Sequence, residues 1–456
     1  MQKAIVVQLV SFAPLLNGEG IRYREDKTCL TIGDMSNYTG WVIFLSCRTL
    51  ETIYVIKTVL PLLKNAKASY RLIKNQEQQY RLNSGAFGET EVGKVITIFP
   101  CSEQSAIDLS VTLTRATNRY KGPVVPDALR IGSVVFLQVA RAIPNESGVN
   151  IQLSHPGKMK IPFTVPKEYQ IKKKRKIIIG KYFIPVELLR ASPKGDIYKA
   201  INLKNLAFTW CLIKQGKPVA LDDHFNREMK DRLLWQKEVL QLLSPHIYTP
   251  SVLDFFEEDG SSYLILDFAE GESISKLIHD KLKGLTWKEI NFLDKDLILG
   301  WFLKSLEIVQ KVHAAGYVHR DISDSNFLVM EDGNICIIDF ELSYSLEKQE
   351  PNPPFLLGTF GYAAPEQLQM YVADPKEDIY SFGALLAFMI TGIHPIELIE
   401  ENINNTKAKL YRLTGSPELV KIILNCLEVS RKDRPELITI HQTIKRHTET
   451  LKRQKS

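Results

Sequence analysis

Three short motifs contain the residues best suited to chemistry: His319-Arg320-Asp321-Ile322-Ser323-Asp324-Ser325-Asn326, then Asp339-Phe340-Glu341, then Ala364-Pro365-Glu366. Carboxylate and amide oxygens are the ligands that a hard cation such as Mg²⁺ prefers. An aspartate among them can also orient and deprotonate a hydroxyl group. These residue types therefore suit a reaction that needs a hard cation and a general base, and chance does not readily explain their order.

In this order the motifs resemble those of protein kinases, and the resemblance covers roughly residues 180 to 445. It implies a bilobal fold that transfers the γ-phosphoryl group of ATP, or of another nucleoside triphosphate, with Mg²⁺. In the family pattern Asp321 is the catalytic base, and Asn326 and Asp339 are the metal ligands.

Two segments before these motifs are expected to bind nucleotide phosphates. The segment Arg190–Ala200 follows a predicted strand, and Gly195 in its small-residue tip would let backbone amides approach phosphate oxygens. A plain β-turn is the alternative, because Gly195 is its only glycine. A second predicted strand ends at Lys214, whose point charge can bind phosphates, although a surface lysine fits the pattern equally well.

The segment Leu233–Leu243 has helical spacing. It places Glu238 where it could pair with Lys214 and hold this lysine at the phosphates. Glu228 is the rival partner.

Another strand runs into a short connector, where the backbone of Asp267 and Ala269 is expected to bind the adenine ring. Two supports of the site are also predicted. Asp378 starts a helix that holds the catalytic loop, and Arg434 can form an ion pair with Glu366.

The segment departs from the common kinase pattern at three places. Its glycine loop is depleted, Ser323 stands where a lysine is usual, and Glu341 replaces the glycine after Asp-Phe. A pseudokinase is therefore one alternative. The retained lysine, glutamate, asparagine and two aspartates favour an active kinase.

These departures resemble class III lanthipeptide synthetases, in which Asp-Phe-Glu is familiar. The segments Lys214–Pro218, Trp235–Leu240 and Phe255–Gly260 are also similar to that family. The resemblance implies a phosphothreonine-lyase-like module before the kinase and a cyclase module after it. We expect no room for the cyclase module in this chain.

Residues 1 to 160 are predicted to form a smaller α+β domain that fits such a module. The expected strands are Trp41–Ser46, Ser69–Ile73 and Gly93–Pro100, and the expected helices are Glu51–Asn65 and Ser102–Arg119. The overall fold class is therefore α+β, with a bilobal kinase-like fold after this domain.

Elimination of phosphate requires a base, an acid and cations that hold the phosphate. The resemblance places the acid and the base at Phe44 and Arg71, and neither exchanges a proton readily near neutral pH. Arg71, Lys94, Lys121 and Arg130 could still bind phosphate. We expect a lyase fold without elimination activity, with a divergent active lyase as the alternative.

The chain has 456 residues, and at about 150 residues per domain two or three domains are expected. We place the lyase-like domain at 1–160, a basic linker at 161–179, a kinase N-lobe at 180–269 and a C-lobe at 270–456. The formal charge of +6 is concentrated partly in Lys172–Lys176, which we interpret as solvated linker. The six cysteines form no CxxC pair, and no apolar stretch approaches the roughly 20 residues of a membrane span, so we expect a cytoplasmic protein.

The predicted function is ATP-dependent phosphorylation of Ser or Thr in a ribosomal precursor peptide during lanthipeptide-type biosynthesis. The alternatives are a regulatory Ser/Thr kinase with a fused interaction domain, and a pseudokinase scaffold. Expected partners are the precursor peptide and separate lyase and cyclase proteins, with no membrane or nucleic acid.

Overall fold

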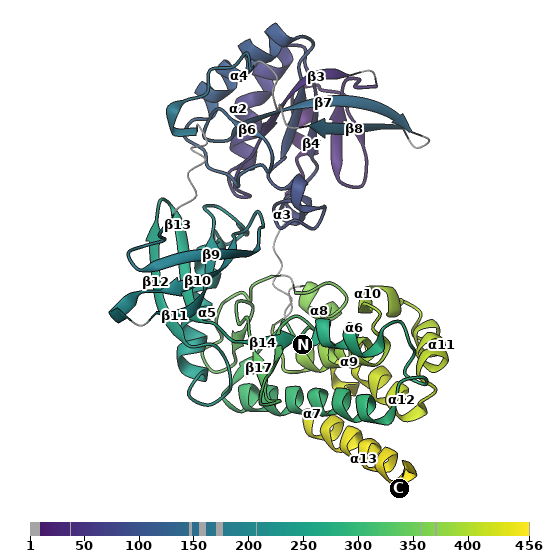
Figure 1. The fold of residues 1–456 in the computed structure, drawn as a ribbon. Helices are drawn as coiled ribbons and strands as arrows, with labels where there is room; N and C mark the ends of the chain where they lie inside the picture. The colour runs from purple at the N-terminus through teal and green to yellow at the C-terminus, as the bar shows by residue number, and fades with distance from the viewer. Residues whose placement is uncertain are drawn as a thin grey trace. The chain divides into compact units, whose positions relative to one another are not determined.

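The computed structural model describes residues 10–36, 38–145, 148–154, 161–169, 177–206, 208–356, 358–369 and 372–455. They divide into two compact units. The first unit contains Val7–Asp231 and Phe256–Tyr263, and the second contains Arg232–Phe255 and Leu264–Ser456. Sheets dominate the first unit and helices the second, as expected for an α+β protein with a kinase-like fold (Figure 1).

The N-terminal part of the first unit is built on an eight-stranded antiparallel sheet. Its strands follow the order β1-β2-β4-β5-β3-β7-β6, and β8 also pairs with β7. Their bounds are Arg24–Glu25 (β1), Cys29–Ile32 (β2), Thr39–Leu45 (β3), Ser69–Ile73 (β4), Ile96–Phe99 (β5), Leu129–Arg130 (β6), Val135–Asn145 (β7) and Gly148–Ser154 (β8).

The larger core of this part involves the helices α2 and α4. In α2, Val55, Val59 and Leu63 recur every four residues, so one helix face is apolar and buried. The Ser102 hydroxyl caps α4 by accepting a hydrogen bond from the Ser105 backbone N–H. The predicted strands and helices of this domain are confirmed; the helices are Ala13–Gly18 (α1), Thr52–Asn65 (α2), Gln76–Asn83 (α3) and Glu103–Thr117 (α4).

A second, smaller core lies apart from the larger one and takes its side chains from several strands. Val42 and Phe44 of β3 belong to it, together with Phe99 and Phe136. Because side chains alternate across a strand, Val42 and Phe44 share one face of β3 while Ile43 joins the larger core. The central strand is therefore buried on both faces.

Three whole strands that we assigned to the kinase N-lobe also belong to the first unit: β9 (Phe183–Arg190), β10 (Ile197–Asn202) and β11 (Thr209–Gly216). They pair antiparallel within a five-stranded sheet of order β12-β13-β11-β10-β9. The bounds of the other two strands are Val252–Glu258 (β12) and Ser261–Asp267 (β13).

The first compact unit extends past the linker that we placed at 161–179, because the loop after β11 contacts the N-terminal domain. Our domain boundaries stay predictions, and the basic run Lys172–Lys176 lies outside the described residues. The Asp222 carboxylate accepts hydrogen bonds from the Thr49 backbone N–H and from Asn83 Nδ2, the latter at 3.1 Å. Arg48 also lies 3.5 Å from Glu228. Buried polar contacts therefore join the two parts of the first unit.

We expect Asp222 to make the stability of this unit depend on pH. Burial raises the pKa of Asp222 to about 6. Since the folded state then binds this proton more tightly than the unfolded state does, Asp222 makes its full contribution to the free energy of unfolding below about pH 4. This contribution falls by about 3 kcal/mol as the pH rises through 6.

Asp222→Asn removes this titration and keeps the shape of the side chain. Asn83 Oδ1 has no partner among the described residues, so a flipped Asn83 amide can accept a bond from the new amide. Urea unfolding of both proteins at about pH 5 and pH 8 measures the effect. From pH 5 to pH 8, the free energy of unfolding of the original protein minus that of the variant should fall by roughly 1–2 kcal/mol. A constant difference would contradict the assignment.

The second unit is mainly helical. Its longest buried element is α9, in which every residue from Glu377 to Ile390 is buried. The helices are Met229–Leu243 (α5), which begins in the first unit, Ile274–Leu282 (α6), Phe292–Ala314 (α7), Pro365–Leu368 (α8), Lys376–Thr391 (α9), Pro395–Leu398 (α10), Ile403–Thr414 (α11), Pro417–Cys426 (α12) and Leu437–Lys455 (α13). Its short strands are Gly271–Ser273 (β14), Tyr317–Val318 (β15), Phe327–Met330 (β16), Ile335–Ile337 (β17) and Tyr344–Ser345 (β18).

Candidate active site

The loop between β15 and β16 holds Asp321 in a fixed position. One carboxylate oxygen of Asp321 accepts hydrogen bonds from the Thr359 backbone N–H at 3.0 Å and the Thr359 hydroxyl at 2.8 Å. The other accepts one from Asn326 Nδ2 at 3.0 Å, and the same nitrogen donates to the Asp321 carbonyl at 2.7 Å. The carboxylate is therefore oriented from both sides.

The electrostatic surroundings of Asp321 favour a proton acceptor. Burial and the nearby charge of Asp339 raise the pKa of Asp321 above its ordinary value. A carboxylate with a raised pKa is a better base for a hydroxyl proton. The geometry therefore allows Asp321 to perform the predicted role.

Asn326 and Asp339 lie at neighbouring ends of a paired β16–β17 hairpin. Phe327 pairs with Ile337, and the Ile338 backbone N–H donates to the Asn326 carbonyl at 2.9 Å. Because the Asn326 amide nitrogen is used by Asp321, its amide oxygen is left for a cation. Together with the Asp339 carboxylate, this oxygen fits Mg²⁺, which usually binds one or two protein carboxylates plus phosphates. The described residues contain no larger cluster of metal-binding side chains.

The predicted supports of the loop are both observed. Asp378 in the first turn of α9 accepts hydrogen bonds from the backbone N–H groups of His319 at 2.9 Å and Arg320 at 2.7 Å. The guanidinium of Arg434 donates two parallel bonds to the Glu366 carboxylate, at 2.6 and 2.9 Å. The ion pair between Arg434 and Glu366 is buried.

A model of the protein kinase domain matches residues 208–447, which is more than half of the chain. The chain belongs to the protein kinase family. The kinase is 27% identical over 286 residues to serine/threonine-protein kinase A of Synechocystis sp., covering 58% of this chain and 53% of that protein. It is 26% identical over 260 residues to a probable serine/threonine-protein kinase KIN1 homolog of Enterocytozoon bieneusi, covering 55% of this chain and 40% of that protein.

The kinase thus spans about half or less of the length of these relatives. Their names support our prediction of a serine/threonine kinase. A second family model, the N-terminal domain of RamC, matches residues 20–139. Within the described residues, no helix combines the length and apolarity needed to cross a bilayer.

The kinase residues expected at the phosphates lie in the loop between β9 and β10 and in β11 of the first unit. Lys214 is buried in β11, opposite Ile197 of β10. A side chain at Gly195 would lie 1.7 Å from the Gln215 carbonyl oxygen, so this position must be glycine for the loop between β9 and β10 to pack against β11. The packing of the loop therefore explains why this position is glycine, and no bound nucleotide is needed for that explanation. Nucleotide binding by Gly195 and Lys214 stays a prediction.

The helix α5 forms as predicted, but Glu238 lies on its exposed face. Gln236, two residues earlier, is fully buried. The Glu228 carboxylate accepts a bond from the Val219 backbone N–H at 2.7 Å and lies near Arg48. The exposure of Glu238 does not favour it as the partner of Lys214, and the pairing itself stays a prediction.

The connector expected to bind adenine follows β13. Asp267 is exposed, and its backbone N–H donates to the Ser251 carbonyl at 2.9 Å. The Ala269 carbonyl accepts a bond from the Gly271 N–H at 3.1 Å. Adenine binding by Asp267 and Ala269 remains a prediction.

Sequence reasoning missed Thr359 as a member of the active site. Its backbone N–H and its hydroxyl both donate hydrogen bonds to the predicted base Asp321, which lies 38 positions earlier in the chain. The position of Thr359 in the sequence could have indicated this role. It lies five residues before Ala364-Pro365-Glu366, in the segment that begins at Asp339.

In the RamC-like domain, the two residues expected at the acid and base positions are neighbours. Phe44 of β3 and Arg71 of β4 both pair with Thr97 of β5, so the three side chains lie in a row on one face. Lys94 Nζ lies 5.1 Å from the Phe44 ring centre and 2.8 Å from Glu91. A cavity of about 150 Å³ is lined by Arg71, Lys94 and Thr97.

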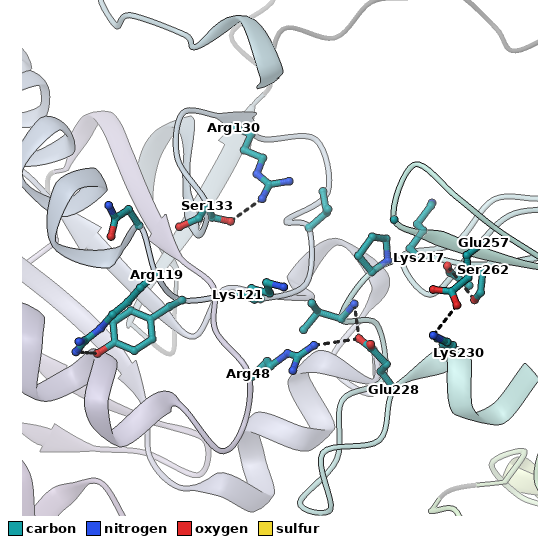
Figure 2. A pocket seen from close by; sticks show the side chains of 18 residues that line it. Arg48, Arg119, Lys121, Arg130, Ser133, Lys217, Glu228, Lys230, Glu257 and Ser262 are labelled. Carbon is teal, nitrogen blue, oxygen red and sulfur yellow. Dashed lines mark hydrogen bonds and ion pairs between the residues drawn. The ribbon is translucent and has the colours of Figure 1, made fainter. Parts of the chain in front are cut away.

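The other two predicted phosphate ligands line a different and larger cavity of the first unit, of about 490 Å³ (Figure 2). Lys121 and Arg130 lie on one wall together with Arg119. Arg130 donates to the carbonyls of Gly132 and Ser133. Among the described residues, no carboxylate forms an ion pair with these three cations.

Three further cations that sequence reasoning missed also line this cavity. Lys230 lies 2.6 Å from Glu257, Arg48 pairs with Glu228, and Lys217 pairs with Asp196, which does not line the cavity. These residues are far apart in the sequence, so no motif reveals them. The cavity as a whole is strongly cationic.

Proposed function

We propose that this kinase transfers the γ-phosphoryl group of ATP to Ser or Thr hydroxyl groups of a ribosomal precursor peptide. The observation that carries the proposal is the Asp321 carboxylate, fixed by Thr359 on one side and Asn326 on the other. A base that is already oriented lowers the entropic cost of reaching the transition state.

In the proposed reaction the hydroxyl oxygen of the peptide attacks the γ-phosphorus. The bond from this phosphorus to the bridging oxygen of ADP breaks, and Asp321 accepts the hydroxyl proton. Asn326 and Asp339 would hold Mg²⁺, which when bound neutralises charge on the phosphate oxygens. Lys214 would position the phosphates by its charge.

Two features support peptide biosynthesis over a regulatory role. The domain before the kinase matches the N-terminal domain of RamC, and Glu341 follows Asp-Phe as in class III lanthipeptide synthetases. The names of the relatives do not separate the two functions, because a regulatory serine/threonine kinase with a fused domain fits them equally well. We propose a cytoplasmic setting.

The RamC-like domain is proposed to bind phosphopeptide without eliminating phosphate. Phe44 is buried and has no exchangeable proton, and Arg71 is a poor base. Arg119, Lys121 and Arg130 can hold a phosphoryl group through charge-assisted hydrogen bonds. Separate lyase and cyclase proteins are then the expected partners that complete a ring.

Mass spectrometry of candidate precursor peptides tests both proposals. With ATP and Mg²⁺ the peptide should gain about 80 Da per phosphoryl group transferred. A synthetic phosphoserine form of this peptide should not lose the roughly 98 Da of phosphoric acid.

Two outcomes would contradict the proposals. Phosphorylation of unrelated proteins but of no peptide encoded nearby would favour the regulatory kinase. A dehydrated peptide that Lys94→Ala abolishes, and Asp321→Asn does not, would show that the domain is a working lyase.

A further inference from the structure

The segment from Asp339 to Glu366 is held to the catalytic loop by Arg320. The guanidinium Nη1 of Arg320 donates to the Phe355 carbonyl at 2.9 Å and to the Leu342 carbonyl at 3.4 Å. These two carbonyls belong to residues 13 positions apart in the segment. Arg320 thus ties two points of the segment to the residue that precedes Asp321.

The helix α5 holds the same segment from another direction. Trp235 Nε1 donates to the Ser343 carbonyl at 2.7 Å, and Arg232 donates to the Leu356 carbonyl at 3.2 Å. The Arg232 guanidinium also lies 4.9 Å from the Phe355 ring centre. The segment is therefore ordered by contacts from two elements.

The charge of Arg320 is neutralised by a carboxylate of the same unit. Arg320 Nε donates to Glu377 Oε2 at 2.8 Å, and both side chains are almost completely buried, at 1% and 0% exposure. In kinases that are switched on by phosphorylation, new pairs between arginine and a phosphorylated residue order this segment. Here Glu377 at the start of α9 supplies the anion.

The segment also offers little for a regulatory kinase to modify. It contains five hydroxyl residues, of which Ser343, Tyr344, Ser345 and Tyr362 are buried. The hydroxyl of the fifth, Thr359, donates to Asp321. A phosphate on any of the four would disrupt packing, and one on Thr359 would place like charge beside the base.

We propose that Glu377 is a positioning residue that takes the place of an activation-segment phosphate. It fixes Arg320, and through Arg320 the segment that orients Asp321. The kinase is therefore competent without phosphorylation of residues 339–366. This inference rests on the proposed phosphoryl transfer.

The first test compares the full-length protein before and after phosphatase treatment, with intact mass and peptide mapping to establish its phosphorylation state. We expect equal transfer rates for both samples. Loss of activity on dephosphorylation, with a phosphate mapped to one of the five hydroxyls, would overturn the inference. A protein inactive in both states would instead contradict the proposed function.

The second test is Glu377→Gln, which removes the charge and keeps the shape. We expect kcat to fall roughly 10- to 100-fold with the KM for ATP unchanged, because Glu377 touches Arg320 and not the substrate. Glu377→Asp should recover part of kcat. The matched control, Glu397→Gln at an exposed position of α10, should leave kcat unchanged. Assays at about pH 8 keep the pair ionised, since burial raises the pKa of Glu377 to about 7.

A double variant covers the case in which Glu377→Gln does not fold. Arg320→Met with Glu377→Leu removes both buried charges and should fold, because no unpaired charge remains. We expect its kcat to be reduced as in the single variant, since the segment loses the bonds from Arg320. Wild-type kcat in either variant would refute the positioning role.

Discussion

Asp321→Asn is expected to lose phosphoryl transfer while nucleotide binding persists. The amide cannot accept the hydroxyl proton, and general-base catalysis contributes roughly 10²- to 10⁴-fold to a rate. Transfer of radiolabelled phosphate should fall by about that factor, whereas calorimetry should show nucleotide affinity close to that of the original protein.

The matched control for this variant is Asp332→Asn. Asp332 is exposed in the turn between β16 and β17, where it accepts a hydrogen bond from the Asn334 N–H at 2.8 Å. It should retain full activity. If Asp321→Asn also retained full activity, Asp321 would not be the base.

Glu366→Ala is expected to destabilise the second unit by about 3–5 kcal/mol. The substitution leaves Arg434 buried with no carboxylate in the bidentate position that Glu366 occupies. An uncompensated buried charge costs far more than the net strength of the ion pair. Thermal and urea unfolding of the full chain measure the loss.

Glu436→Ala provides the control of the same residue type. Glu436 pairs with Lys376 at 2.6 Å but is exposed, so its loss should cost less than about 1 kcal/mol. The double variant Glu366→Leu with Arg434→Met should recover much of the stability, because both buried charges are gone. Similar effects of Glu366→Ala and Glu436→Ala would contradict the role assigned to the buried pair.

Local sequence was sufficient for the catalytic loop and the elements around it. Asp321 and Asn326 are five residues apart, and a chain that turns between two short strands must place them close together. The periodicity of Leu233–Leu243 likewise predicted α5, and the strand predicted at Ser69–Ile73 is observed as β4. Such patterns work because the geometry of a turn, helix or strand fixes the positions of nearby residues.

The periodicity of a helix did not reveal which of its polar residues faces the core. Glu238 fitted the kinase pattern by type, yet packing buries Gln236 and leaves Glu238 exposed. A helix can rotate about its axis until its apolar residues are covered, and that rotation depends on its neighbours. The same holds for the four predicted phosphate ligands of the RamC-like domain, which the fold divides between two cavities.

The sequence alone was enough to recognise the protein kinase family and to predict a base and two metal ligands, because these residues lie in short motifs with fixed spacing. How the predicted base is held follows from the tertiary structure. In the sequence Glu377 is an acidic residue in the first turn of a helix, where it would stabilise the helix dipole. Folding brings it to Arg320, 57 positions earlier, and Thr359 to Asp321. Contacts between distant segments depend on how whole elements pack, and no local pattern encodes that packing.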